Sequence, residues 1–190
     1  MRWCPTGLFS FLPFHAAGCY DDGITIESAS DYFISSYIPT IGLLLTQDSP
    51  PSTERFKMMT VIQSQALSST RMELEKIERH VSSDLLVKFG IPGSTASVEA
   101  VATKLSDVAI VHFACHGTQH QYNPLNSGLK LEDGWLSVSR IMKEKIPNGA
   151  LAFLCACETA QGVEKLPDEV MSLGACLLFS GFRRVVATMW

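Results

Sequence analysis

The sequence predicts an α/β fold in which a mostly parallel sheet is flanked by helices in a three-layer αβα arrangement, with one small β-hairpin outside the sheet. Short apolar runs bounded by turn residues recur along the chain, and amphipathic segments separate them. The chain has 190 residues, of which 46% are hydrophobic and 18% are charged, enough for a buried core. We therefore expect residues 1–190 to form a single domain.

Four apolar runs are the candidate strands of this sheet. They cover residues 56–64, 107–115, 149–156 and 183–190. Helical spacing of apolar residues predicts a helix over 69–81. A second predicted helix begins near Ser97 and leads into the second strand.

Three further elements follow from turn and capping signals. Residues 127–138 alternate apolar and polar side chains around Asp133-Gly134, which predicts a hairpin. Residues 139–146 are predicted to be helical. A last helix is expected over 167–181, with a proline near its start and Gly181 at its end. Residues 1–49 are less regular, and we assign them to the same domain because so short a segment would form a marginal core alone.

The composition of the chain argues against nucleic acid and membranes as partners. The net charge is -4, and the basic residues are scattered, so we do not expect nucleic acid binding. No apolar run is long enough to span a membrane, and prolines interrupt the one N-terminal segment that resembles a secretory signal. The six cysteines lack the spacing of a disulfide scaffold. These features predict a cytoplasmic protein without a membrane partner.

Two chemically capable side chains follow predicted strands. His116 comes after the apolar run that ends near residue 115, and Cys157 comes after the run that ends near residue 156. In an open parallel sheet, functional groups gather at the carboxyl ends of the strands. A thiolate beside an imidazole can attack an amide, and backbone amides such as that of Gly117 can stabilise the oxyanion. This chemistry needs no metal and no organic cofactor.

The plainer interpretation is that the cysteines are small buried hydrophobic residues. Cys155 lies between apolar neighbours, whereas Cys157 meets the polar stretch ETAQG. Because reactivity requires access, Cys157 is the better nucleophile and Cys155 is expected to complete the buried strand. The same reasoning makes His112 a core histidine with a satisfied ring.

A zinc site is the alternative that the ligand types suggest. The candidate ligands form two groups in the sequence: His112, Cys115, His116, His120, Cys155 and Cys157. However, residues four apart in a strand are about 13 Å apart at ~3.3 Å per residue, and Cys-x-Cys is not the usual zinc spacing. We therefore expect no metal site and keep zinc binding only as a less favoured alternative.

Several ordered motifs resemble a known family. VHFACHG (111–117), LCACETAQG (154–162) and GFRRVVATMW (181–190) are similar to the CHAT domain, a caspase-like peptidase domain often found after tetratricopeptide repeats. The resemblance implies a caspase-haemoglobinase fold with a catalytic dyad of His116 and Cys157. It also implies that the backbone amides of Gly117 and Cys157 form the oxyanion hole. The family usually has a serine where this chain has Cys155.

The resemblance implies a cysteine-type endopeptidase that hydrolyses peptide bonds through a thioester acyl-enzyme, with a protein or peptide as substrate. The alternative is an inactive CHAT-like protein-interaction module. Tetratricopeptide repeats, which commonly supply regulatory partners in the family, are absent from this chain. The family pattern also continues beyond Trp190, so we expect the domain to be truncated at its C-terminus.

Overall fold

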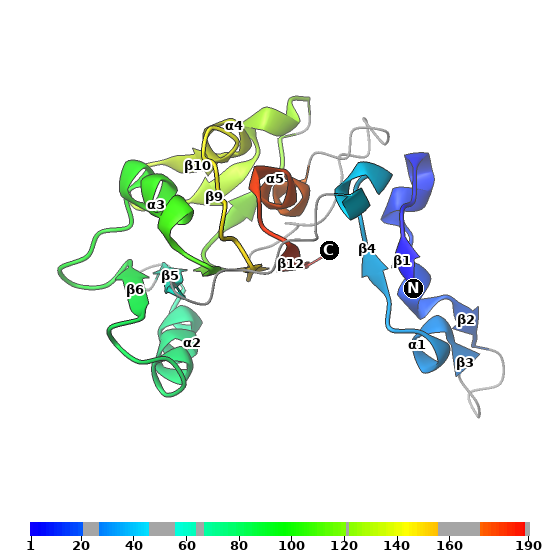
Figure 1. The fold of residues 1–190 in the computed structure, drawn as a ribbon, viewed down its shortest axis with the longest axis horizontal. Helices are drawn as coiled ribbons and strands as arrows, with labels where there is room; N and C mark the ends of the chain where they lie inside the picture. The colour runs from blue at the N-terminus through cyan, green and yellow to red at the C-terminus, as the bar shows by residue number, and fades with distance from the viewer. Residues whose placement is uncertain (21–26, 46–55, 64–66, 121, 156–171, 189–190) are drawn as a thin grey trace.

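A five-stranded sheet lies at the centre of the protein (Figure 1). The computed structural model describes residues 1–20, 27–45, 56–63, 67–120, 122–155 and 172–188. The strand order is β12-β11-β7-β5-β6, and every neighbouring pair is parallel. The strands are β5 (Met58–Ile62), β6 (Leu86–Phe89), β7 (Ile110–Ala114), β11 (Leu151–Leu154) and β12 (Arg184–Ala187).

The sheet confirms a mixed α/β fold with a mostly parallel centre. Each of the four predicted strands lies within its expected range. Within this sheet, the strand that the sequence did not predict is β6, which forms one edge. Its run is short and includes Lys88, whose Nζ lies 2.9 Å from Glu78 Oε1. An edge strand needs no continuous apolar sequence, which explains the missed prediction.

Serine residues begin three of the helices that pack on this sheet. They are α3 (Val98–Lys104), α4 (Val138–Ile141) and α5 (Leu173–Ser180). The side chains of Ser97, Ser137 and Ser172 each accept a hydrogen bond from the backbone N–H three residues later. These caps satisfy amide groups that have no partner within the helix. The predicted first turns of the last helix, before residue 172, lie outside the described residues.

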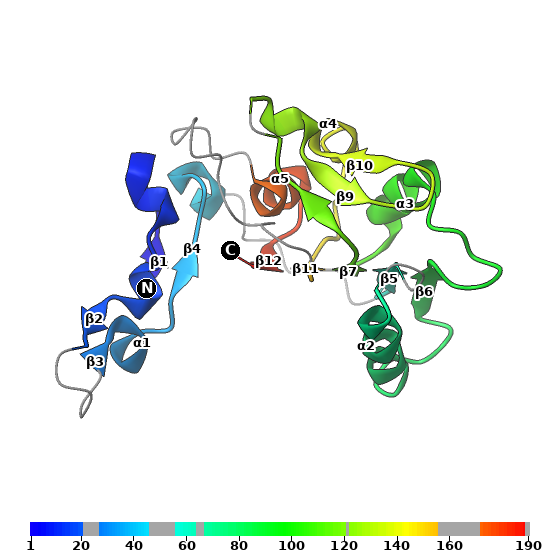
Figure 2. The ribbon, with the colours of Figure 1, turned by 180° about the vertical axis from the view of Figure 1, so that it is seen from behind.

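The two faces of the sheet carry different helices (Figures 1 and 2). Side chains of α3, α4 and α5 pack against one face in the larger apolar cluster, and we call this the α5 face. Helix α2 (Ser69–Glu78) packs against the other, which we call the α2 face. On the α2 face, Leu74 joins Ile62, Leu86 and Ala114 in a small cluster near β5 and β6.

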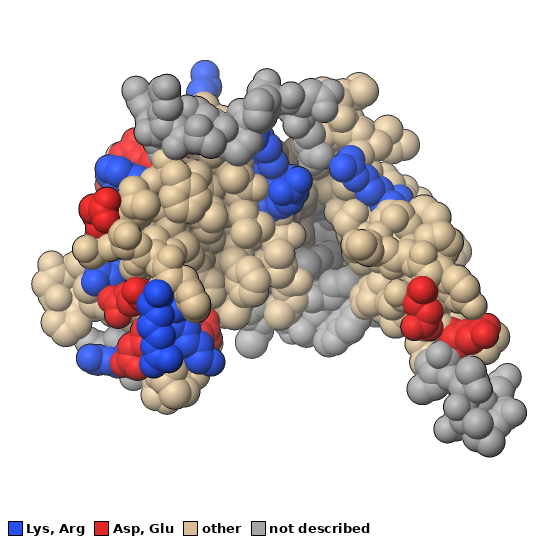
Figure 3. Space-filling view, turned by 60° about the horizontal axis from the view of Figure 1, so that its bottom comes forward, with Lys and Arg blue, Asp and Glu red and all other residues tan. Residues whose placement is uncertain are grey.

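The outer side of α2 is charged. Figure 3 shows Lys, Arg, Asp and Glu side chains of both signs gathered over this helix. One pair joins Arg71 Nε and Glu75 Oε1 at 3.7 Å, and both side chains are well exposed. The apolar residues Leu74 and Ile77 face the sheet instead, so α2 has the amphipathic pattern that the sequence predicts.

The predicted hairpin is present outside the main sheet. Strands β9 (Gly128–Lys130) and β10 (Trp135–Ser137) are antiparallel, and β8 (Gly117–Thr118) adds a third strand. The hairpin turn is fixed to the start of α3, because Glu132 accepts from the Ala96 N–H and Asp133 accepts from the Val98 N–H.

The N-terminal residues lie to one side of the main sheet (Figure 2). Strand β1 (Arg2–Trp3) pairs with β4 (Ser36–Tyr37), and β2 (Gly18–Cys19) pairs with β3 (Glu27–Ser28). Helix α1 (Ala29–Tyr32) accompanies them, as do the short 3-10 helices Gly7–Phe11, Phe14–Ala16 and Ile41–Leu45. Within the described part of the chain, none of these strands joins the five-stranded sheet.

Among all the residues that the structure describes, no helix is both long and apolar enough to cross a membrane.

Candidate functional site

The carboxyl ends of β7 and β11 lie side by side, because these two strands are paired in parallel register. His116 follows β7 by two residues and is exposed. Its backbone N–H donates to Gln63 Oε1 at 3.2 Å, and its carbonyl oxygen accepts from the Lys130 N–H at 2.7 Å. Gly117 is the first residue of β8. The structure therefore holds the His116 backbone between β5 and the hairpin.

The predicted nucleophile, Cys157, lies outside the described residues. The described segment 122–155 ends at Cys155, whose backbone N–H donates to the Phe113 carbonyl at 2.8 Å. This bond extends the pairing of β11 with β7 by one step beyond Leu154.

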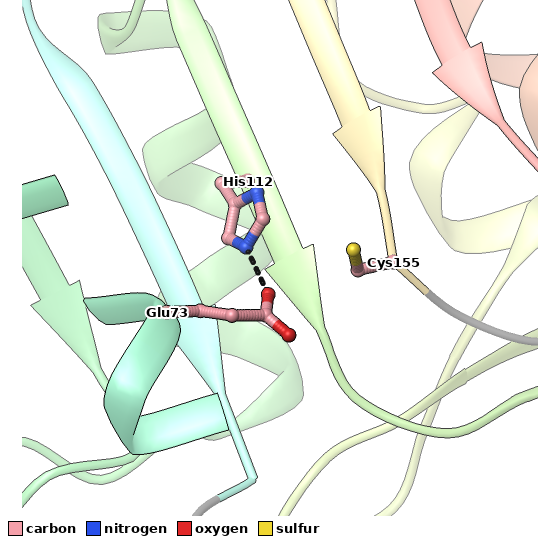
Figure 4. A group of neighbouring side chains, drawn as sticks. All are labelled: Glu73, His112 and Cys155. Carbon is pink, nitrogen blue, oxygen red and sulfur yellow. Dashed lines mark hydrogen bonds and ion pairs between the residues drawn. The ribbon is translucent and has the colours of Figure 1, made fainter. Parts of the chain in front are cut away.

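A different set of side chains meets on the α2 face of the sheet (Figure 4). One ligand-type atom from each of Glu73, His112 and Cys155 lies within 4.8 Å of the others. His112 Nε2 is 2.9 Å from Glu73 Oε2. The three residues come from α2, β7 and the chain just after β11. We call them the Glu-His-Cys cluster.

Strand register explains how this cluster forms. His112 pairs with Phe153, and residues directly opposite in a parallel ladder lie on the same face. Their rings are stacked with centroids 5.3 Å apart, which fixes the imidazole plane. Cys155 lies two residues after Phe153 and so returns to the same face. Glu73 then reaches the imidazole from the helix above.

The prediction for His112 is confirmed, because it is 8% exposed and its ring contacts Glu73. The prediction for Cys155 is wrong. It does not complete a buried strand: β11 ends at Leu154 and Cys155 is exposed. The physical reason is that α2 packs on β5 and β6 rather than on β11, which also leaves Phe153 36% exposed.

The ligand set considered from the sequence does not converge as a whole. Cys115 is buried in the larger apolar cluster, and burial raises the pKa of its thiol to about 12. His120 lies in its own loop, where Nδ1 accepts from the Tyr122 and Asn123 N–H groups. Only His112 and Cys155 of that set meet among the described residues, and they do so with Glu73.

Sequence reasoning missed Glu73. It lies on the predicted helix over 69–81, beside apolar Leu74, and no local motif links it to a strand many residues later. The available signal was weak: a carboxylate adjacent to the buried side of an amphipathic helix. Such residues are usually solvated, so only the packing of α2 on the sheet identifies this one.

The local electrostatics keep the Cys155 thiol protonated. Although the residue is exposed, partial burial of the thiol raises its pKa, and the Glu73 charge and hydrogen bond raise that pKa further. Both the partial burial of the thiol and a neighbouring anion disfavour a thiolate. In the absence of a cation, Cys155 is therefore a poor nucleophile near neutral pH.

The fold and the strand-end residues together define an α/β domain of the kind that supports chemistry at the carboxyl edge of a parallel sheet. The family model described as the CHAT domain matches residues 1–190, the whole chain, and the protein therefore belongs to the CHAT domain family. This confirms the resemblance seen in the sequence motifs, and the family indicates a caspase-like peptidase domain. A comparison with curated proteins gave no match.

Proposed function

We propose that this protein is a caspase-like cysteine endopeptidase in which Cys157 is the nucleophile and His116 is the general base and acid. The observation that carries the proposal is the parallel pairing of β7 with β11. Both strands end at the same edge of the sheet, so the residues that follow them start from neighbouring points, and functional groups gather at this edge of such sheets. Membership of the CHAT family supports the same pair.

The reaction uses one proton acceptor and one nucleophile. His116 takes the Cys157 thiol proton, and the sulfur attacks the carbonyl carbon of the peptide bond. When the tetrahedral intermediate collapses, the C–N bond breaks and the amine leaves with the proton from His116. Water, deprotonated by His116, then attacks the thioester. The C–S bond then breaks, the acid product is released, and the Cys157 thiolate takes back a proton from His116.

The backbone near Gly117 supports an oxyanion hole formed with the Cys157 amide. The Lys130 N–H bonds to the His116 carbonyl, which makes Gly117 and Leu129 a non-hydrogen-bonded pair in the antiparallel ladder. The Gly117 N–H therefore points away from β9, and we assign it as one donor to the substrate oxygen. We extend the proposal to the complete fold, a three-layer αβα arrangement of the caspase-haemoglobinase type, and to a protein or peptide substrate in the cytoplasm.

A thiol-directed peptide probe tests the assignment. The protein is incubated with the probe, digested, and mapped by mass spectrometry, while hydrolysis of a mixed fluorogenic peptide library is followed in parallel. Cys157→Ala and His116→Ala should each abolish hydrolysis, and Cys157→Ala should also abolish probe labelling. Cys155→Ala is the matched control, two residues away, and should retain most of both signals.

Two results would contradict the proposal. Hydrolysis that survives Cys157→Ala but is lost in Cys155→Ala would transfer the nucleophile to the other cysteine. Absence of both labelling and hydrolysis in the folded wild-type chain would favour the inactive interaction module instead.

A further inference from the structure

The Glu-His-Cys cluster has no role in the proposed peptidase reaction, which uses His116 and Cys157. Its three side chains come from separate elements and bring together a carboxylate, an imidazole and a thiol within 4.8 Å. A core histidine needs only one partner to satisfy its ring, and Glu73 already supplies it at 2.9 Å. The nearby thiol is thus unnecessary for that structural role. We propose that Glu73, His112 and Cys155 form a zinc-binding site.

The donor set matches the preferences of zinc. Zn²⁺ is a borderline-soft cation that binds nitrogen, sulfur and carboxylate oxygen, whereas Mg²⁺ and Ca²⁺ prefer oxygen alone. Three protein ligands leave one position of a tetrahedral metal open to water. On binding, Zn²⁺ displaces the Cys155 thiol proton to solvent and forms bonds to the thiolate sulfur, His112 Nε2 and a Glu73 oxygen.

The required movement is small. Bond lengths of about 2.0–2.3 Å place tetrahedral zinc ligands roughly 3.3–3.6 Å apart. The cluster spans at most 4.8 Å, and its His112–Glu73 contact is 2.9 Å, so shifts of about an ångström suffice. The Glu73 side chain is 35% exposed and Cys155 is also exposed, so both have room to adjust. His112 is the fixed member, because Phe153 stacks on its ring.

A polar atom beside the cluster supports the presence of a further group. Thr60 of β5 pairs directly with His112 in the sheet and lies on the same face. It is fully buried, and its Oγ1 has no hydrogen-bond partner within the described part of the chain. Buried hydroxyl groups are normally hydrogen-bonded. The face that carries the cluster therefore includes one buried polar atom that the described protein groups leave for a further partner.

Metal titration of the purified 190-residue chain tests the site. After chelator treatment and desalting, Zn²⁺ binding is measured by calorimetry, and Co²⁺ is used as a spectroscopic probe. We expect one tight equivalent, a sulfur-to-cobalt charge-transfer band, and a thermal unfolding midpoint that rises with Zn²⁺ concentration. Cys155→Ser and Glu73→Gln should each weaken binding, and the former should remove the charge-transfer band. For Cys155→Ser we expect a loss of more than about a hundredfold, beyond that of an outer-shell change.

The controls separate this site from the peptidase dyad and from misfolding. Cys157→Ala and His116→Ala should bind Zn²⁺ as the wild type does, so the site can stand if the proposed dyad fails. Glu75→Gln, which removes the same charge from the same helix, is the matched control for Glu73→Gln and should leave Zn²⁺ binding unchanged. Each metal-free variant is compared by its unfolding midpoint. The proposal is overturned if no tight equivalent binds, if Cys155→Ser leaves affinity and spectrum unchanged, or if Cys157→Ala or His116→Ala removes the metal.

Discussion

The two faces of the central sheet are built from the same strands but serve different purposes. On the α5 face, Phe113 and Leu154 are almost completely buried beneath helices in an apolar cluster. On the α2 face, helix packing is limited to the β5 and β6 side, and the Glu-His-Cys cluster occupies the region toward β11. The difference indicates that the α5 face supplies most of the stability, while the α2 face tolerates polar and reactive groups.

Replacing one phenylalanine on each face should give the largest contrast. Phe113→Ala removes a fully buried ring and should lower the free energy of unfolding by about 3–5 kcal/mol. Phe153→Ala removes a ring that is 36% exposed, with its stack on His112, and should cost only about 1 kcal/mol. Urea unfolding followed by circular dichroism measures both. Equal losses would show that the α2 face contributes as much to the core as the α5 face.

Thr60→Val and Val61→Thr, at neighbouring positions of β5, compare how the two faces of the sheet tolerate a buried hydroxyl group. Thr60 and Val61 are both fully buried but lie on opposite faces. In metal-free protein, Thr60→Val removes a hydroxyl without a described partner and should leave stability unchanged or raise it by about 1 kcal/mol. Val61→Thr places a hydroxyl in the apolar cluster and should cost about 1–3 kcal/mol.

Urea unfolding of the chelator-treated protein measures the stability of both variants. A marked destabilisation by Thr60→Val would mean that this hydroxyl has a structural partner even without metal. A neutral Val61→Thr would mean that the α5 face accommodates polar groups after all, and the contrast between the faces would fail.

The sheet could be predicted from the sequence because four of its five strands contain short continuous apolar runs. Continuous apolar runs such as 107–115 are typical of such strands, and turn residues bound them. The edge strand β6 is interrupted by Lys88 and has no such run, whereas β12, at the other edge, lies within the predicted run 183–190. The family motifs carry more information than periodicity alone, and they identified the domain family over the whole chain.

Of the candidate site residues, the sequence predicted the position of His116 but not the surroundings of Cys155 or the contact made by Glu73. His116 lies at a strand end as expected, since strand ends are visible where an apolar run stops. The environment of Cys155 could not be deduced, because sequence neighbours do not reveal which strands a helix covers. Glu73 and His112 are 39 residues apart, and their contact depends on how α2 packs on the sheet. Such contacts between distant elements leave no local pattern.

The reactivity of Cys155 offers the smallest and most specific test of the α2 face. Burial is the main reason that the pKa of its thiol is raised, and the Glu73 charge and hydrogen bond add to it. Glu73→Gln should lower this pKa while leaving it above the ordinary value, because the burial remains. The thiolate is the reactive form, so iodoacetamide should modify Cys155 a few-fold faster at mildly alkaline pH, and the rate profile should shift toward lower pH.

Peptide mass mapping of chelated protein resolves Cys155 from the other thiols, with exposed Cys19 as an internal reference. Glu75→Gln changes the same charge on the same helix but at a residue paired with Arg71, so it should leave the Cys155 profile unchanged. If both variants accelerate modification equally, the effect belongs to the general charge of α2. If only Glu73→Gln does so, the carboxylate acts directly on the thiol, and the α2 face differs from the α5 face in electrostatics as well as in packing.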